Sequence, residues 1–156
     1  DDTALQVYLD QAIAEINRST ARSFEASTST AKKYGYNDYE GQVLLLGDDC
    51  LTVTAVVNGN GETITSGNYT LLPRNGTPKY AIDLHIGYAW STTADISITG
   101  TWGYSTTAGA EVQRVVYRLA YFYWQKRLST GVIQSAMEYP ADVREWLRAM
   151  RRREYI

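Results

Sequence analysis

The sequence is poor in the residue types that most often build metal and catalytic sites. It contains one cysteine, Cys50, and one histidine, His85, among 156 residues. A single cysteine forms no internal disulfide, and one cysteine with one histidine cannot supply a structural zinc site. A Ser–His–acid triad would have to use His85 as its base, and no glycine-flanked serine elbow accompanies it. We therefore expect no catalytic residues, no metal and no cofactor, and ordinary structural roles for Cys50 and His85.

Long apolar runs and phosphate or calcium motifs are also missing. No apolar stretch approaches the roughly 20 residues that a membrane-spanning helix needs, so no membrane partner is expected. Asp48 and Asp49 follow a glycine but lack the spaced oxygen ligands of a calcium loop. The NGNGE turn at residues 58–62 is too short for a phosphate-binding loop. The absence of these motifs argues against an enzyme.

Acidic and basic side chains are unevenly distributed along the chain, although the net charge is only −2. Residues 35–103 carry seven acidic and two basic side chains, whereas residues 104–156 carry nine basic and five acidic ones. A simple DNA-binding protein would instead present a basic surface to the phosphates. The asymmetry suits a protein that meets different surfaces with its two parts, or simply acidic loops and basic helix ends.

The most informative stretch that is present is residues 95–104, DISITGTWGY. Ile96 and Ile98 alternate with polar residues, as in a half-buried strand. A glycine-hinged aromatic corner then leads into a helix that begins near residue 110. This structural corner comprises Gly100, Trp102, Gly103 and Tyr104.

Apolar spacing predicts helices at both ends of the chain and strands between them. The helices are expected over residues 1–24, over about 110–128 and after Pro140. Strands are expected at residues 43–46, 50–57, 62–65, 69–72, 80–84 and 95–102, separated by glycine-, asparagine- and proline-containing turns, one of them a GDD turn at residues 47–49. The predicted class is α+β: a helical bundle, made of an N-terminal helix and two C-terminal helices, with an inserted small antiparallel sheet or sandwich. A single domain, residues 1–156, would have its helical body at 1–30 and 105–156 and its β insertion at 35–104.

Aromatic residues are plentiful, with thirteen tyrosines and four tryptophans. Aromatic side chains are enriched at protein interfaces, but they also fill β-rich cores. Both interpretations stay open on the sequence alone.

Taken in order, several segments resemble the head–tail connector, or adaptor, proteins of tailed bacteriophages. The first helix ends in INRSTARSF, similar to a helix that closes on a Thr-X-Arg-aromatic turn. VLLLGDDCLTVTAV followed by SGNYTLLP is similar to the family's paired strands, and ITGTWGY resembles its corner before the long helix. YPADVREWLRAMRRR resembles its closing Pro-X-X-Val helix with a basic end. The ordered set spans nearly the whole chain.

The resemblance implies a structural virion protein at the head–tail interface, assembled in the host cytoplasm. Its copies would form a ring, dodecameric by analogy, beneath the portal protein. The ring would extend the channel through which genomic DNA passes and would hold a stopper or tail-completion protein.

The resemblance also implies that the C-terminal region docks on the portal. Trp146 and Met150 could equally face the protein's own core. The residues carried over to portal docking are Val143, Trp146, Leu147, Arg148, Met150, Arg151, Arg152, Arg153, Tyr155 and Ile156.

Acidic loops that faced such a channel would repel DNA phosphates and let the genome slide. The candidates for this channel-facing role are Asp48, Asp49 and Glu62. Replacing the two aspartates by lysine is then expected to slow DNA ejection.

Other classes of protein remain as alternatives. A tail, baseplate or head-decoration protein would share a strand-rich, tyrosine-rich surface without needing a basic docking end. A carbohydrate-binding module is suggested by Trp90 and Trp102, although the helices at both ends speak against it. A nucleic-acid-processing enzyme ranks last because no acidic metal cluster is present.

Overall fold

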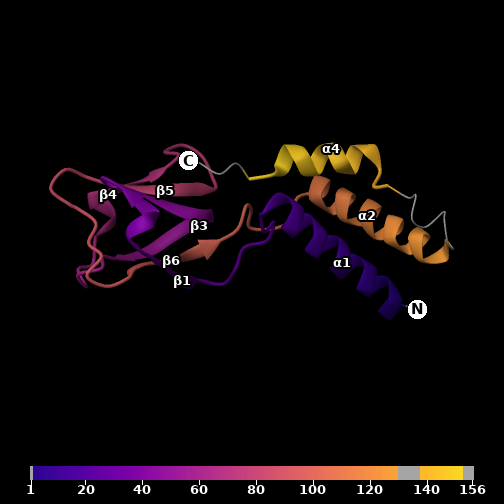
Figure 1. Ribbon diagram of the computed structural model, residues 1–156, viewed down its shortest axis with the longest axis horizontal. Coiled ribbons are helices and arrows are strands. Elements are labelled where there is room, and N and C mark those ends of the chain that lie inside the picture. Colours follow the sequence, from indigo (N-terminus) through magenta and orange to yellow (C-terminus); the bar gives the residue numbers. More distant parts are fainter. Residues whose placement is uncertain (1, 130–137, 153–156) are drawn as a thin grey trace. The chain divides into compact units, whose positions relative to one another are not determined.

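The structure, a computed structural model, describes residues 2–129 and 138–152 and divides into two compact units. One unit comprises Asp1–Arg22 and Ala108–Ile156, and the other comprises Ser23–Thr107. The first is helical and the second is a β-sheet inserted between its helices (Figure 1). The predicted α+β class with an inserted antiparallel sheet is confirmed.

Three described helices lie side by side in the helical unit (Figure 1). They are α1 (Asp2–Thr20), α2 (Ala110–Leu128) and α4 (Ala141–Met150). Helix α2 buries Val115, Leu119 and Phe122, which recur at the spacing of one helical face. Most of the predicted connector between α2 and α4 lies outside the described residues. The long helix predicted over residues 110–128 is confirmed with those bounds.

Helix α1 contributes a narrower buried stripe than its sequence predicts. Ala12 and Ile16 are fully buried, whereas Leu5 and Ile13, which belong to the same set of helically spaced apolar residues, are exposed. The apolar face of α1 is therefore wider than the surface on which it packs.

Polar contacts fasten the ends of the helices to one another. Arg22 donates from Nε to the carbonyl of Met150 at 2.8 Å, and the amide of Arg152 donates to the carbonyl of Thr20 at 2.8 Å. Asp142, in the first turn of α4, pairs with two arginines of α2 at 3.2 and 3.1 Å, Arg114 and Arg118. Exposed ion pairs of this kind contribute little individually, so the apolar packing supplies most of the stability of the unit.

The sheet unit contains six strands in one antiparallel sheet. Their order is β1-β6-β3-β5-β4, and β2 pairs with β3 beside this path. The strands are β1 (Thr30–Tyr34), β2 (Tyr39–Glu40), β3 (Val43–Val57), β4 (Tyr69–Leu72), β5 (Lys79–Leu84) and β6 (Ile96–Trp102). Two short 3-10 turns, η1 (Tyr36–Asp38) and η2 (Ser66–Asn68), precede β2 and β4.

Strand β3 corrects the prediction of two strands separated by a GDD turn. The chain does not reverse at Gly47; it continues as one strand of 15 residues with an irregular register between Leu45 and Cys50. Gly47 has φ +67°, a conformation that glycine adopts without strain. The two halves of β3 thereby pair mainly with different strands, the first with β5 and the second with β6.

Strand β6 shows the predicted alternation clearly. Ile96, Ile98, Gly100 and Trp102 are buried, and the residues between them are half-buried. They join one hydrophobic core with residues of β3 and β5, among them Leu44, Leu46, Cys50, Val56, Ile82 and Leu84. The buried position expected for Cys50 is confirmed.

Two further expectations for the strands differ from the structure. Strand β1 was not predicted, because only Tyr34 of its five residues is buried and the segment has no alternating pattern. Backbone pairing to β6 forms this strand instead. Residues 62–65 form no strand; a single bridge joins Thr63 to Val57.

Candidate functional site

The described residues hold no arrangement typical of an enzyme. Within residues 2–129 and 138–152, no group of three or more His, Cys, Asp or Glu side chains is placed to hold a metal ion. His85 is exposed, and its Nε2 lies 2.9 Å from the hydroxyl of Thr70. None of the helices over the same residues is long and apolar enough to cross a membrane. The candidate functional sites are therefore exposed surfaces and the contacts that hold segments of the chain together.

The glycine-hinged corner is built around the indole of Trp102 at the end of β6. Trp102 is 5% exposed, and its indole N–H donates to the carbonyl of Thr30 on β1 at 2.9 Å. The Nζ of Lys32 lies 4.4 Å from the centre of its ring, within the range of a cation–π interaction. A side chain at Gly100, two residues earlier, would meet the carbonyl oxygen of Thr52 on β3 at 2.1 Å. Only glycine allows β6 and β3 to approach this closely.

Gly103 and Tyr104 continue the corner toward the segment that follows α1. Gly103 has φ +146°, and its amide donates to the carbonyl of Asp49 at 2.9 Å. The amide of Tyr104 donates to the carbonyl of Ser23 at 2.7 Å. The ring of Tyr104 packs on that of Phe24, with centroids 5.4 Å apart. The four corner residues thus join the two segments of chain that enter and leave the sheet unit.

The three candidate channel-facing acids do not form one surface. Asp48 is exposed and pairs with Lys32, whereas Asp49 is 7% exposed. Glu62 is exposed in the turn that follows β3, in which the amide of Asn58 donates to its carbonyl at 2.8 Å. At about 3.3 Å per strand residue, that turn begins roughly 30 Å along β3 from Asp48. The burial of Asp49 corrects its placement on an open surface, and Asp48 and Glu62 remain as exposed candidates.

The apolar residues of α4 pack within the helical unit. Val143, Trp146 and Leu147 are buried, and Met150 is half-buried. Of the two roles open for Trp146, packing in the protein's own core is the one that the structure shows. A docking role for this helix therefore belongs to its exposed side chains.

The basic residues of the C-terminal end differ in their surroundings. Arg148 and Arg151 are exposed and form no ion pair within the described part of the chain, whereas Arg152 is half-buried. Arg153, Tyr155 and Ile156 lie outside the described residues. Arg148 in the last turn of α4 and Arg151 directly after it thus provide exposed positive charge without an acidic partner among the described residues, whereas Arg144 pairs with Glu138.

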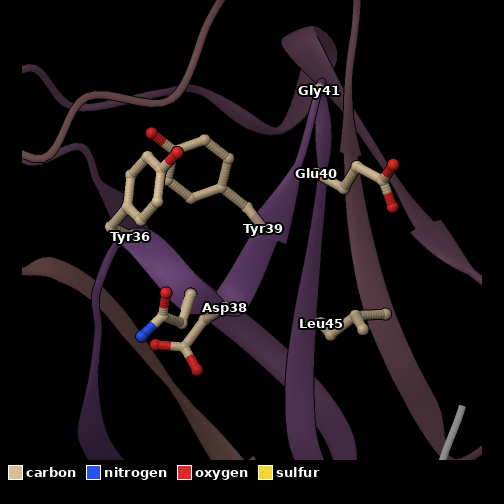
Figure 2. Close-up of a pocket in the computed structure, with 7 residues that line it drawn as sticks. Tyr36, Asp38, Tyr39, Glu40, Gly41 and Leu45 are labelled. Carbon is tan, nitrogen blue, oxygen red and sulfur yellow. The ribbon is translucent and has the colours of Figure 1, made fainter. Parts of the chain in front are cut away.

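A shallow pocket of about 500 Å³ lies beside η1 and the first half of β3. Figure 2 shows the rings of Tyr36 and Tyr39 next to each other on one side of it, with Glu40 and Leu45 on the other. Asp38 accepts the amide of Gly35 at 2.6 Å, so its carboxylate closes the turn. The pocket is open and has no converging set of polar groups, which argues against a small-molecule site.

Sequence reasoning missed a stripe of exposed aromatic and aliphatic residues on α2. Three of its four members, Tyr117, Tyr121 and Trp124, follow a buried residue of the same helix by two positions, which is about 200° of rotation at 3.6 residues per turn. The signal was present as apolar residues at i, i+4, i+7 and i+11, but the sequence alone does not show which apolar face of this helix is buried. The stripe consists of Tyr117, Tyr121, Trp124 and Leu128.

Solved structures with a similar fold come from gene transfer agent (GTA) particles, two of them from the neck. A chain of "Neck of empty GTA particle computed with C6 symmetry" matches 100% of this chain and 81% of its own length, with a TM-score of 0.70 and 23% identity. A chain of "Neck of native GTA particle computed with C12 symmetry" matches 98% and 84%, with a TM-score of 0.69 and 23% identity. A third, from the virion of a native gene transfer agent (GTA) particle, has a TM-score of 0.65 at 23% identity.

At this level of identity the similarity shows a shared fold. It extends over both the helical unit and the sheet unit, because the chain is matched over its whole length. No protein-family model and no curated protein sequence matches the chain.

The thiol of Cys50 gives a first test of the buried core. Burial raises the pKa of Cys50 from 9.0 to about 11, against smaller opposing effects of Lys32 and of a backbone hydrogen bond with Thr52. The thiolate fraction at neutral pH is then roughly a hundredfold below that of an ordinary cysteine. We expect native Cys50 to resist maleimide at neutral pH and to react readily once the protein is unfolded in urea. Rapid labelling of the native protein, followed by mass spectrometry, would contradict the buried assignment.

The same pKa shift predicts how alkaline pH acts on stability. The unfolded chain loses the thiol proton near pH 9.0 and the folded chain near pH 11. The contribution of Cys50 to the free energy of unfolding is therefore complete below pH 9.0 and declines as the pH rises above it. Burial raises the pKa of Tyr34 as well, so its contribution has the same sign.

Proposed function

We propose that this chain is a non-catalytic structural subunit of the neck of a tailed-phage-like particle. Its copies form a ring beneath the portal, extend the DNA channel, and connect the head to a stopper or tail-completion protein. The proposal places the protein in the virion at the head–tail interface. The observation that carries it is the full-length structural similarity to chains from GTA necks.

The symmetry of those neck structures supports a ring. One was computed with C12 and one with C6 symmetry, and twelve copies satisfy both. A closed ring needs two different faces on each subunit, so that a single type of contact repeats around the axis. Twelve is the copy number that we propose for this protein.

The different charge of the sheet unit and of the C-terminal segment supports a different role for each. The sheet unit, residues 23–107, carries eight acidic and four basic side chains, and the C-terminal segment, residues 108–156, carries nine basic and five acidic ones. An acidic lining would repel the phosphates of passing DNA, for which Asp48 and Glu62 are the exposed candidates. The basic end of α4 would bind an acidic surface of the portal.

Portal docking through α4 predicts a specific loss when its charge is reversed. The double variant Arg148→Glu and Arg151→Glu is expected to weaken portal binding by about tenfold or more, because two attractive contacts become repulsive. Its thermal stability should stay within a few degrees of the unchanged protein, since both side chains are exposed. Co-sedimentation with the portal from the same genome measures the effect.

A matched control reverses charge elsewhere in the chain. Arg74→Glu removes an exposed arginine of the sheet unit and should leave portal binding unchanged. If the α4 variant also bound the portal as tightly as the unchanged protein, docking through this end would be wrong. If the unchanged protein bound capsids and did not bind the portal, it would instead be a head-decoration protein.

A further inference from the structure

The stripe on α2 is largely exposed and belongs to no buried cluster within the described residues. Tyr117, Tyr121 and Trp124 are 63%, 57% and 42% exposed, and Leu128 is 63% exposed. The opposite face of the helix, through Val115, Leu119 and Phe122, already provides its contact with the helical unit. Large aromatic side chains on a second, exposed face therefore need another explanation.

The stripe is ordered and large enough to mark an interaction surface. The rings of Tyr121 and Trp124 stack with centroids 5.6 Å apart, and Gln125 donates to the Tyr121 hydroxyl at 3.0 Å. Aromatic side chains of roughly 150–250 Å² each, about half exposed, give the stripe on the order of 400 Å². Apolar patches of this size on soluble proteins commonly mark binding sites. A shallow groove of about 410 Å³, lined by Tyr117, Tyr121 and Pro140 among others, runs beside the stripe.

Helix α1 carries a second exposed apolar surface with the opposite charge. Leu5 and Ile13 are 56% and 43% exposed, and with the half-buried Leu9 between them they follow at i, i+4 and i+8 along one side of the helix. The helix bears three acidic residues and one basic residue over Asp2–Thr20, and that one, Arg18, already pairs with Glu15. Helix α2 bears four basic residues and one acidic residue over Ala110–Leu128. Two exposed apolar surfaces of opposite net charge thus belong to different helices of the same unit.

We infer that the α2 stripe of one copy binds the exposed apolar face of α1 on the next copy. This contact is heterologous, because it joins two different surfaces, and such contacts continue beyond a dimer and form a ring when the rotation between neighbouring copies closes. Opposite charges on the two helices favour the α2–α1 contact and disfavour contacts between like helices. The inference rests on the proposed ring for its closure, and it assigns the surfaces that build that ring.

A single contact of this size is expected to be weak in solution. Stable interfaces bury about 800 Å² on each partner, roughly twice what the stripe offers. The closed ring strengthens each contact because every subunit is held on two sides. The test therefore traps the contact covalently at high protein concentration.

Cysteine cross-linking distinguishes the proposed contact from the other pairings. One preparation carries Gln6→Cys on α1 and the other carries Gln113→Cys on α2, which are exposed polar positions beside the apolar residues of each surface, and the two are mixed with a short bis-maleimide. The buried native Cys50 stays in place, because it is expected to be inert under these conditions. The mixed dimer is expected to exceed either like-with-like dimer by about tenfold, as judged by mass spectrometry. Like dimers in excess, or no cross-link above background, would overturn the inference.

Two controls tie the cross-link to the stripe. Ile86→Cys presents a fully exposed apolar position of the sheet unit, 95% exposed, and should give only background product with Gln113→Cys. Adding Tyr121→Glu to the Gln113→Cys protein should lower the mixed dimer by about tenfold, since a charge on an apolar contact is costly. An unchanged yield would show that the stripe takes no part.

The same samples separate the interface from the proposed function. Rings on the portal without the cross-link would leave the neck role in place and reject this interface. The cross-link without rings on the portal would support self-association and count against the neck role.

Discussion

The variant Gly100→Ala is expected to destabilise the sheet unit by about 3 kcal/mol or more. A methyl group at this position would lie 2.1 Å from the carbonyl oxygen of Thr52, and that oxygen belongs to the backbone of β3. The clash cannot be relieved by rotating a side chain. Strands β6 and β3 would have to separate where they pair, at Gly100 and Val53.

Urea unfolding followed by circular dichroism measures this loss. Gly67→Ala is the matched control, because no atom lies within 4 Å of the added methyl group and its backbone is not left-handed. It should change the free energy of unfolding by no more than about 0.5 kcal/mol. Equal stability of the two variants would contradict the close approach of β6 and β3.

The variant Trp102→Ala is expected to cost about 3–5 kcal/mol. The indole is buried in the core of the sheet unit and its N–H donates to the carbonyl of Thr30. The ammonium group of Lys32 lies over its ring. Its removal therefore leaves a cavity, an unpaired carbonyl and a displaced cation at the junction of β1 and β6. Trp102→Phe keeps most of the apolar surface and loses the hydrogen bond, so a smaller cost of about 1–2 kcal/mol is expected.

Trp124→Ala provides the comparison within the same protein. This tryptophan is exposed on α2, so its removal should cost less than about 1 kcal/mol while weakening the proposed contact between copies. The pair thus separates a tryptophan that stabilises the fold from one that serves association. Similar losses of stability at both positions would count against this separation.

The sequence predicted the elements whose own residues carry the periodic signal. Strand β6 alternates at every position, and α2 repeats its apolar residues at helical spacing, so both were located closely. Strand β1 was missed because pairing with β6, rather than its own pattern, holds it in the sheet. Gly47 was read as a turn because a local sequence does not show whether a glycine reverses a strand or forms a bulge.

The candidate surfaces were less predictable because burial depends on tertiary packing. Asp49 and Trp146 have ordinary sequence surroundings, yet both are buried, by contacts that a local pattern does not reveal. The α2 stripe could be identified only after the structure showed which face of the helix the subunit already uses. Charge asymmetry was readable from composition, and it still supports the proposed roles of the two units.

The proposed neck function is tested most directly by electron microscopy of this protein mixed with the portal from the same genome. We predict an additional ring of density stacked on the narrow end of the portal, with twelvefold symmetry in class averages. The Arg148→Glu and Arg151→Glu double variant should leave the portal bare under the same conditions. Bare portals in the presence of excess unchanged protein would contradict the proposed function.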